Sequence, residues 1–342
     1  MPKGGSFSKT LVAWQRRHGR KDLPWQGRRD PYRIWLSEVM LQQTQVAAVK
    51  PYYERFLARF PDVVSLAGAL QEEVLKLWSG LGYYARARNL HAASRKIVSE
   101  SGGRFPDRAE EIERLPGIGR STAGAIAAFA FGERVAILDG NVKRVLARCY
   151  GIEGWPGERA VETRLWQLAE KLLPKRSIEI YTQALMDLGA TVCTKTKPDC
   201  NACPLRRTCI ARKKSRVEDI PAPRPKKALP TRRTTWLLLL HKGSILLERR
   251  PSAGLWGGLW TFPEAGPKNV ERAFGCEITG VKKLKILEHG FSHFKLRIRP
   301  ILCEVSRISP RAEESGRMWI DIEDAKGAAV PAPVRKLLER IR

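Results

Sequence analysis

Residues 115–123 read LPGIGRSTA and run directly into an apolar segment, GAIAAFAF, at residues 124–131. Gly117 and Gly119 bracket a single apolar residue just before this segment. Such glycines leave backbone N–H groups uncovered at the positive end of the following helix, and this geometry binds phosphates. Residues 109–115 have a helical pattern, so the stretch predicts a helix, a hairpin and a second helix. As a bare pattern it is only a turn, and its meaning depends on what accompanies it.

An aspartate follows this hairpin along the chain. Residues 138–142 read LDGNV, which sets Asp139 immediately before a predicted helix. The ordinary explanation of such an Asp is an N-cap worth about 1 kcal/mol, and taken alone the pattern favours it. A chemical role for Asp139 therefore needs independent support.

The charge of the chain predicts an anionic partner. There are 62 Lys and Arg against 35 Asp and Glu, a net charge of +27 over 342 residues, which makes nucleic acid the first candidate. The longest purely apolar runs, residues 236–240 and 125–130, are far shorter than the roughly 20 residues of a membrane-spanning helix, which excludes a transmembrane protein. The N-terminus has no apolar signal-peptide core. We expect a cytoplasmic monomer, associated with the nucleoid if the source is prokaryotic.

The pattern divides the chain into two domains and a linker. From residue 6 to residue 212, apolar residues recur at three- and four-residue spacing, which predicts an all-α domain. Residues 213–230 contain four prolines among Arg and Lys, a composition typical of an extended linker. Residues 231–342 are expected to form a small α+β domain. Its predicted elements are strands at 234–240, 245–248, 282–287 and 295–305, a Lys242-Gly243 turn after the first strand, and an amphipathic helix at 333–341.

Four of the seven cysteines crowd into one short segment, at Cys193, Cys200, Cys203 and Cys209. In the reducing compartment expected here they are not a disulfide framework. Their spacing can place four thiolates around one centre, and the residues alone allow either a zinc ion or an iron–sulfur cluster. The scattered Cys149, Cys276 and Cys303 are predicted to be buried apolar thiols.

The hairpin, Asp139 and the cysteine spacing together resemble the endonuclease III superfamily of base-excision DNA glycosylases. Other stretches are similar to its adenine DNA glycosylase (MutY) branch: LPW at 23–25, WLSEVMLQQT at 35–44, GLWGGLW at 254–260 and FSH at 291–293. The resemblance covers nearly the whole chain in the same order. It implies one four-iron four-sulfur cluster on the four cysteines and a double-stranded DNA partner in which adenine faces 8-oxoguanine or guanine.

Two carboxyl groups are the candidates for the chemistry. Removing a base breaks a glycosidic bond through an oxocarbenium-like sugar, which one carboxyl can assist with a proton and another with its charge. Glu38 stands three residues from both Trp35 and Leu41 on one predicted helix, so apolar neighbours should raise its pKa and keep it protonated. By the resemblance, Glu38 protonates adenine N7, Asp139 stabilises the sugar cation or bonds to it transiently, and Asn141 supports Asp139 and the DNA backbone. A lone Glu on a helix is otherwise more often solvated.

The resemblance also implies residues that contact the base and the DNA. Extruding a purine costs a few kcal/mol, which groups that fill the gap offset. Gln43, Thr44 and Tyr83 match the wedge positions of the family, and Trp25 and Gln183 match positions that line the adenine pocket.

Position 121 separates two reaction types. Superfamily members that also cut the strand carry a Lys there as the Schiff-base nucleophile, whereas this chain has Ser121, whose hydroxyl cannot form an imine. We therefore expect a monofunctional glycosylase. Lys143, close to Asp139 in the sequence, is expected to contact a DNA phosphate.

The C-terminal domain looks like the Nudix-type fold of the nucleotide-cleaning pyrophosphatases. Those enzymes hold magnesium on a helix with an Arg-Glu and a Glu-Glu pair, whereas residues 263–280 offer only the dispersed Glu264, Glu271 and Glu277. Hydrolase activity is therefore disfavoured. In the family this domain reads the opposite base through a loop that matches Phe291, Ser292 and His293, where a ring can lie beside a base and the polar groups can contact it.

Three other functions compete with adenine excision. A pyrimidine glycosylase with lyase activity is opposed by Ser121 and by the C-terminal domain. A non-catalytic iron–sulfur DNA-binding protein is opposed by the presence of both Glu38 and Asp139. A nucleotide pyrophosphatase is opposed by the missing acidic cluster.

Overall fold

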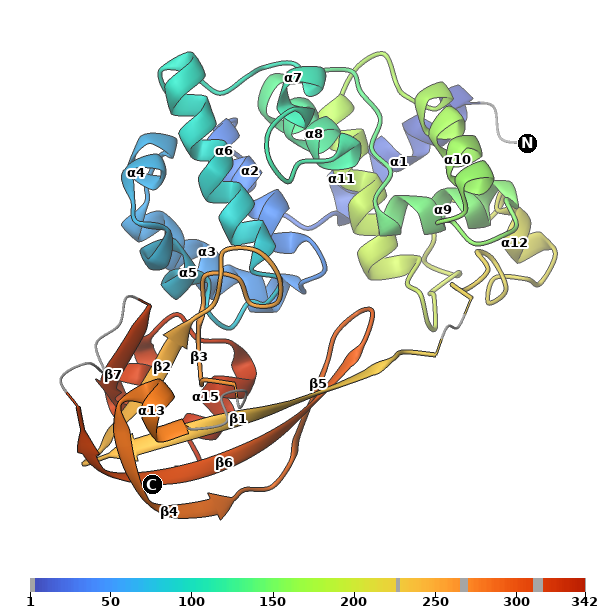
Figure 1. Ribbon diagram of the computed structural model, residues 1–342. Coiled ribbons are helices and arrows are strands. Elements are labelled where there is room, and N and C mark those ends of the chain that lie inside the picture. The colour runs from blue at the N-terminus through green and yellow to red at the C-terminus, as the bar shows by residue number, and fades with distance from the viewer. Residues whose placement is uncertain (1–3, 226–227, 265–269, 310–315, 342) are drawn as a thin grey trace. The chain divides into compact units, whose positions relative to one another are not determined.

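The computed structural model describes residues 4–225, 228–264, 270–309 and 316–341, and their contacts divide the chain into two compact units (Figure 1). The first unit comprises Met1–Ala67 and Ala92–Lys226, and the second comprises Gly68–His91 and Lys227–Arg342. The predicted order of an all-α domain followed by an α+β domain is confirmed. A short helical segment, Gly68–His91, nevertheless belongs with the second unit. Among the described residues, no helix is both long and apolar enough to cross a membrane.

The first unit is helical throughout. Its elements are α1 (Gly4–His18), α2 (Pro31–Leu41), α3 (Val46–Arg59), α4 (Val63–Gly68), α7 (Ala109–Glu113), α8 (Arg120–Ile126), α9 (Gly140–Tyr150), α10 (Arg159–Lys171), α11 (Ile178–Asp187) and α12 (Ile210–Lys213). Two π-helical turns, Ala127–Phe131 and Leu188–Val192, extend α8 and α11. Large apolar side chains such as Phe7, Leu146 and Leu185 form one buried core between α1, α9, α10 and α11. Burial of these faces, rather than helix propensity alone, holds the short helices in place.

The predicted helix, hairpin and helix correspond to α7, the turn after it and α8. Gly117 has φ of +78°, a left-handed conformation that glycine adopts without strain, and Gly119 is the N-cap of α8. Inside α8, a Cβ on Gly124 would lie 2.6 Å from the carbonyl oxygen of Ala136. The glycine therefore lets α8 pack closely against the segment that leads to Asp139.

The start of the predicted linker packs on the first unit. Ile220 is buried, its carbonyl accepts from Nε of Arg148 at 2.9 Å, and the N–H of Ala222 donates to Gly154 at 3.1 Å. An apolar residue in a polar stretch thus anchors this part of the chain. Residues 226 and 227 of the predicted linker lie outside the described residues.

The second unit contains a mixed sheet. Its strands are β1 (Thr231–His241), β2 (Ser244–Arg249), β3 (Trp260–Thr261), β4 (Cys276–Lys283), β5 (Leu287–Gly290), β6 (Lys295–Ile308) and β7 (Arg317–Asp321). The described strands run in the order β3-β2-β1-β6-β4, with β5 also on β6 and β7 also on β2. β1 runs parallel to β6, and residues 236–239 are buried on both of its faces, as expected of a central strand (Figure 1). The predicted hairpin at Lys242-Gly243 joins β1 to β2.

Helices accompany the sheet and the segment Gly68–His91. They are α5 (Gln71–Trp78), α6 (Ala85–Ser101), which continues into the first unit, α13 (Val270–Phe274), α14 (Ile322–Gly327) and α15 (Ala332–Leu338). The predicted C-terminal helix at 333–341 corresponds to α15.

The single strand predicted at 282–287 is wrong, because β4 ends at Lys283 and β5 begins at Leu287. Both strands pair with β6, and the break between them faces Arg299 and Pro300. Pro300 has no N–H to donate to a neighbouring strand, so the antiparallel ladder is interrupted there.

Candidate active site

Two cavities lie side by side in the first unit. The first, of about 370 Å³, is lined by α2, α11 and residues 20–29, and the second, of about 770 Å³, is lined by residues 41–46, the start of α8 and the start of α9. The residues that line both are Arg20, Glu38, Leu41, Val46 and Met186. The first cavity is within the usual size range of small-molecule pockets. Glu38 therefore stands where the two cavities meet.

Glu38 is presented by α2, a helix with a well-defined start. Asp30 caps it by accepting from the N–H of Arg33 at 3.2 Å, and Pro31 occupies the first helical position. Trp35, Leu36 and Val39 beside Glu38 are buried. Burial first, and then the negative charge of Asp139, raises the pKa of Glu38 to about 8. The direction agrees with the raised pKa predicted from the sequence, and a raised pKa favours the protonated form of Glu38.

Asp139 is the N-cap of α9 and accepts from the N–H of Val142 at 2.7 Å. Nδ2 of Asn141 lies 3.4 Å from the other carboxylate oxygen. Burial raises the pKa of Asp139, while the hydrogen bonds from Val142 and Asn141 favour its charged form. The capping interpretation is thus correct, but the same side chain also lines the second cavity. Asp139 can therefore cap α9 and still present its carboxyl group to the second cavity.

The two carboxyl groups come from distant parts of the sequence and meet because α2 packs against α8. The hydroxyl of Ser121, in the first turn of α8, accepts from the N–H of Leu138 at 2.9 Å and so fixes the residue before Asp139. The arrangement sets Glu38, whose raised pKa favours its protonated form, beside Asp139, whose carboxyl oxygens accept hydrogen bonds. Such a pair can protonate a leaving group and stabilise a cation.

The other residues predicted around the base divide between the two cavities. Trp25 and Gln183 line the first cavity, and Gln43 and Thr44 line the second. Trp25 packs edge-on against the ring of Tyr53. Gln43 has φ of +57°, where the chain turns after α2.

Known proteins match both parts of the chain. Residues 36–171 match the HhH-GPD superfamily of base excision DNA repair proteins, and residues 235–340 match the NUDIX domain. The adenine DNA glycosylase of Buchnera aphidicola subsp. Acyrthosiphon pisum is 38% identical, over 98% of this chain and 97% of that protein. The chain belongs to the adenine DNA glycosylase family. The human adenine DNA glycosylase is 34% identical, over 97% of this chain and 73% of that protein.

Solved structures support the fold of the helical part. A thermostable thymine-DNA glycosylase aligns with a TM-score of 0.56 at 30% identity, covering 62% of this chain and 97% of that chain. Endonuclease III in a non-covalent complex with DNA aligns with a TM-score of 0.53 at 24% identity, over 63% of this chain and 99% of that chain. The family and fold predicted by resemblance are confirmed.

The four clustered cysteines of this family member line one small cavity, together with Arg148, Arg206 and Arg212. Nη1 of Arg148 lies 3.5 Å from Sγ of Cys193. Burial, and then the nearby thiols of Cys193, Cys209 and Cys200, raise the pKa of Cys203 to about 12. Among the described residues, no group of three or more His, Cys, Asp or Glu has the arrangement that holds a single metal ion. Four thiols that line one cavity beside three cations are a donor set that fits an anionic cluster.

Lys143 is placed differently from the other predicted DNA contacts. Its Nζ pairs with Glu162 at 2.5 Å, and neither cavity is lined by it. Its predicted phosphate contact would therefore need this ion pair to open, and it stays a prediction, as do the contacts of Gly117 and Gly119.

Tyr83 and the Phe291–His293 tip are in the second unit. Tyr83 has φ of +50° and is 51% exposed, and the guanidinium of Arg86 lies 5.5 Å from its ring. The loop before it is held by the carbonyl of Val330, which accepts from Ser79 at 3.0 Å and from Tyr84 at 3.4 Å, and by Arg335, which donates to Ser79 at 2.8 Å. The segment that carries Tyr83 is thus fastened to the C-terminal domain.

The predicted lesion-reading residues form the tip between β5 and β6. The ring of Phe291 stacks on Phe294 with centroids 4.5 Å apart, and the N–H of Phe291 donates to the carbonyl of Phe294 at 2.9 Å. Ser292 and His293 are exposed, with Ser292 Oγ 3.3 Å from His293 Nδ1.

The acidic residues considered for Nudix chemistry have separate partners. Glu264 pairs with Arg250, Glu271 accepts from the N–H of Ile278, and Glu277 pairs with Arg307. They form no shared group in the described part of this domain, which excludes residues 265–269.

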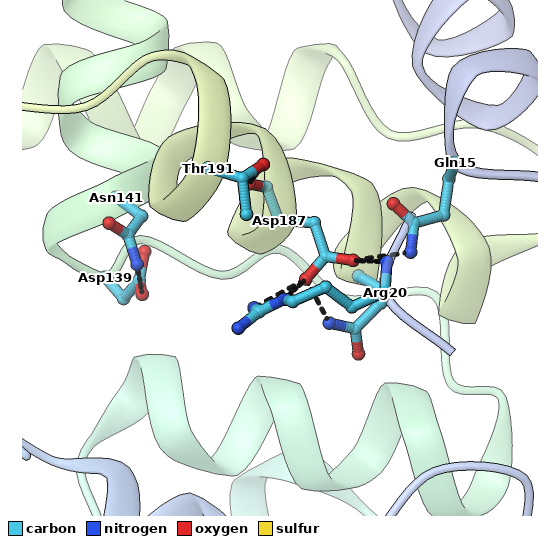
Figure 2. A network of polar contacts seen from close by, with 7 residues as sticks. Gln15, Arg20, Asp139, Asn141, Asp187 and Thr191 are labelled. Carbon is cyan, nitrogen blue, oxygen red and sulfur yellow. Dashed lines mark hydrogen bonds and ion pairs between the residues drawn. The ribbon is translucent and has the colours of Figure 1, made fainter. Parts of the chain in front are cut away.

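Two functional residues were not predicted from the sequence: Arg20, which lines both cavities, and its buried partner Asp187. Asp187 is fully buried at the end of α11, where Arg20 donates to it (Figure 2). A signal was present, because Asp187 interrupts the apolar face made by Tyr181, Ala184 and Leu188. An acidic residue in such a position is rarely buried without a partner.

Proposed function

We propose that the chain removes adenine paired with 8-oxoguanine, or with guanine, from duplex DNA by hydrolysing the N-glycosidic bond in base excision repair. The observation that carries the proposal is that Glu38, whose pKa is raised, stands where two cavities meet, beside the hydrogen-bonded Asp139. Membership of the adenine DNA glycosylase family makes the chain a DNA glycosylase and supports adenine as the base.

In the proposed reaction the extruded adenine enters the first cavity, and its sugar lies in the second. Glu38 gives its proton to N7, so adenine leaves as a neutral base when the bond between N9 and C1′ breaks. The positive charge that develops on the sugar is stabilised by the carboxylate of Asp139. A water then adds its oxygen to C1′, its proton returns to Glu38, and an abasic site remains.

The reaction is proposed to end at the abasic site. Ser121 provides a hydroxyl that already accepts from the N–H of Leu138, and a hydroxyl cannot form an imine with the sugar aldehyde. The DNA strand should therefore stay intact until it is treated with alkali.

We also propose that Cys193, Cys200, Cys203 and Cys209 hold one four-iron four-sulfur cluster. The four thiols that line one cavity, the three arginines around them and the family resemblance support this cluster. When bound, the cluster supplies a covalent link between the segments that carry its ligands. The purified protein should be yellow-brown, with broad absorption near about 400 nm. A colourless protein with stoichiometric zinc would contradict this assignment.

The second unit is proposed to read the base opposite adenine. Ser292 and His293 are exposed on a tip whose backbone is fixed by stacking of Phe291 on Phe294. Tyr83 is exposed in the same unit and is proposed to fill the gap left by the extruded base.

The test is incubation of the full chain with duplexes that carry one A:8-oxoguanine, A:G or T:G pair, with and without hot alkali. We expect release from the two adenine duplexes and strand breaks only after alkali. Release of thymine alone, or strand cleavage without alkali, would favour a pyrimidine glycosylase with lyase activity. Binding without any base release would favour a non-catalytic DNA-binding protein.

A further inference from the structure

Asp187 is the centre of a buried polar network beside the first cavity. One carboxylate oxygen, Oδ1, accepts from Nε of Arg20 at 2.8 Å, from Nη2 of Arg20 at 2.6 Å and from Nε2 of Gln183 at 2.9 Å. The other, Oδ2, accepts from Nε2 of Gln15 at 2.8 Å and from the backbone N–H of Arg20 at 2.9 Å. Figure 2 shows Gln15 and Arg20 converging on Asp187 from the start of the chain. The carboxylate is therefore occupied by donors and is not available as a proton acceptor for the reaction.

This network fixes the orientation of the Gln183 side-chain amide, whose nitrogen donates to Asp187. An ionised carboxylate only accepts hydrogen bonds, so the amide must direct its nitrogen towards Asp187. The carbonyl oxygen of Gln183 is on the opposite branch of the amide, and Gln183 lines the first cavity. A ligand there meets a hydrogen-bond acceptor whose orientation depends on Asp187.

The surroundings of Asp187 hold its side chain in place, so the orientation of the Gln183 amide is fixed as well. Its side chain is fully buried at the end of α11, and its carbonyl accepts from the hydroxyl of Thr191 at 2.8 Å in the π-helical turn that follows. Gln183 and Asp187 are four residues apart on the same helix, where side chains meet. Hydrogen bonds between a carboxylate and an arginine are short and strong, so Asp187 holds its donors firmly.

We propose that Asp187 is a positioning residue that makes the first cavity select a purine with an amino group at C6. It acts by holding Gln183 so that the amide carbonyl accepts from that amino group. Adenine carries this donor, whereas hypoxanthine, which has the same ring system, carries a carbonyl acceptor at C6. The inference rests on the proposed function, because it takes the first cavity as the base pocket.

The test compares single-turnover release of adenine and of hypoxanthine, each opposite 8-oxoguanine, by the full chain. The variants are Asp187→Ala, Gln183→Leu and the double variant. The intrinsic lability of the two bases is the same in every variant, so it cancels from the ratio of rates. Asp187→Ala should lower the adenine-to-hypoxanthine ratio by about tenfold, the scale of one good contact to a base edge. In the Gln183→Leu background the same change should leave the ratio within about twofold, because Asp187 acts through Gln183.

A control separates positioning from general loosening of the helix. Leu185→Ala removes a buried side chain from α11 and should lower the melting temperature without moving the ratio. The inference would be overturned if Asp187→Ala slowed the release of adenine and of hypoxanthine equally. It would also be overturned if Asp187→Ala changed the adenine-to-hypoxanthine ratio as much in the Gln183→Leu background as in the unmodified chain. If Asp187→Ala does not fold, Gln183→Leu must still lower the ratio, and an unchanged ratio would overturn it. Failure of the proposed function is a different result, since the unmodified chain would then release no adenine.

Discussion

The cavities of the first unit and the Phe291–His293 tip of the second unit are proposed to act on the same mispair, yet they are built differently. Glu38 and Asp139 are placed by capping, by helix packing and by burial that shifts their pKa values. At the tip Phe291 stacks on Phe294 and the His293 ring contacts Phe294 edge-on, but the side chains of Ser292 and His293 are exposed. The fold thus sets the protonation of the first pair before DNA arrives, whereas the tip gains its effect only from contacts with DNA. Changes in the cavities should therefore alter the rate, and changes at the tip should alter discrimination.

The largest effect is expected from Glu38→Gln. The amide is nearly isosteric but cannot deliver a proton, so adenine release should fall by about 100- to 10,000-fold. Binding to the A:8-oxoguanine duplex should stay within a few-fold, measured by titration at fixed salt. Glu54→Gln on the exposed face of α3 is a matched control and should not change the rate. Unaltered turnover in Glu38→Gln would remove Glu38 from its role.

Asp139→Asn should cost about 100- to 1,000-fold in single-turnover rate, because the sugar cation loses its counter-charge. Asp62→Asn is the control, since Asp62 also caps a helix by accepting from the N–H of Ser65 at 2.8 Å. That control should change neither the rate nor the stability appreciably, because Asn caps a helix about as well as Asp does. If both variants keep their rates, Asp139 is a cap and nothing more.

A combined Ser292→Ala and His293→Ala change should act on discrimination rather than on chemistry. The preference for A:8-oxoguanine over A:G should fall by about 1–3 kcal/mol in binding and single-turnover rate, while release from A:G is little changed. Ser306→Ala, exposed on β6, is the control. Full-length variants are preferable to truncation near Pro221, which would remove the contacts of Val330 and Arg335 with the loop before Tyr83. A preference that survives the double change would show that the tip does not read the lesion.

A separate effect is expected on stability rather than on activity. Since the folded state raises the pKa of Glu38 from 4.5 to about 8, the folded protein keeps a proton that the unfolded chain loses over this range. The contribution of Glu38 to stability is full below pH 4.5 and is lost as the pH rises through about 8. Glu38→Gln should therefore melt increasingly above the unmodified chain as the pH rises through this window, measured by calorimetry. A constant difference in melting temperature across the window would show that the pKa is not raised.

The sequence predicts the parts of the site that follow from local rules. Helical spacing places Glu38 among Trp35 and Leu41, and the position before a helix explains Asp139, so both could be found without a structure. Asp187 and Arg20 could not be paired in advance, because they are distant in the chain and meet only when α11 packs against α1. The grouping of Gly68–His91 with the second unit depends likewise on long-range contacts. The break between β4 and β5 comes from Pro300 on the neighbouring strand, which the pattern of residues 282–287 does not contain.

The most direct test of the proposed reaction is the protonation state of Glu38, because the reaction depends on a carboxyl that is neutral at physiological pH. It can be measured by carbon-13 NMR of glutamate-labelled protein, with the Glu38 carboxyl assigned by its absence in Glu38→Gln. We expect a titration midpoint of about 8, which shifts down in Asp139→Asn because the neighbouring negative charge is removed. A midpoint near 4.5, unchanged in Asp139→Asn, would contradict it.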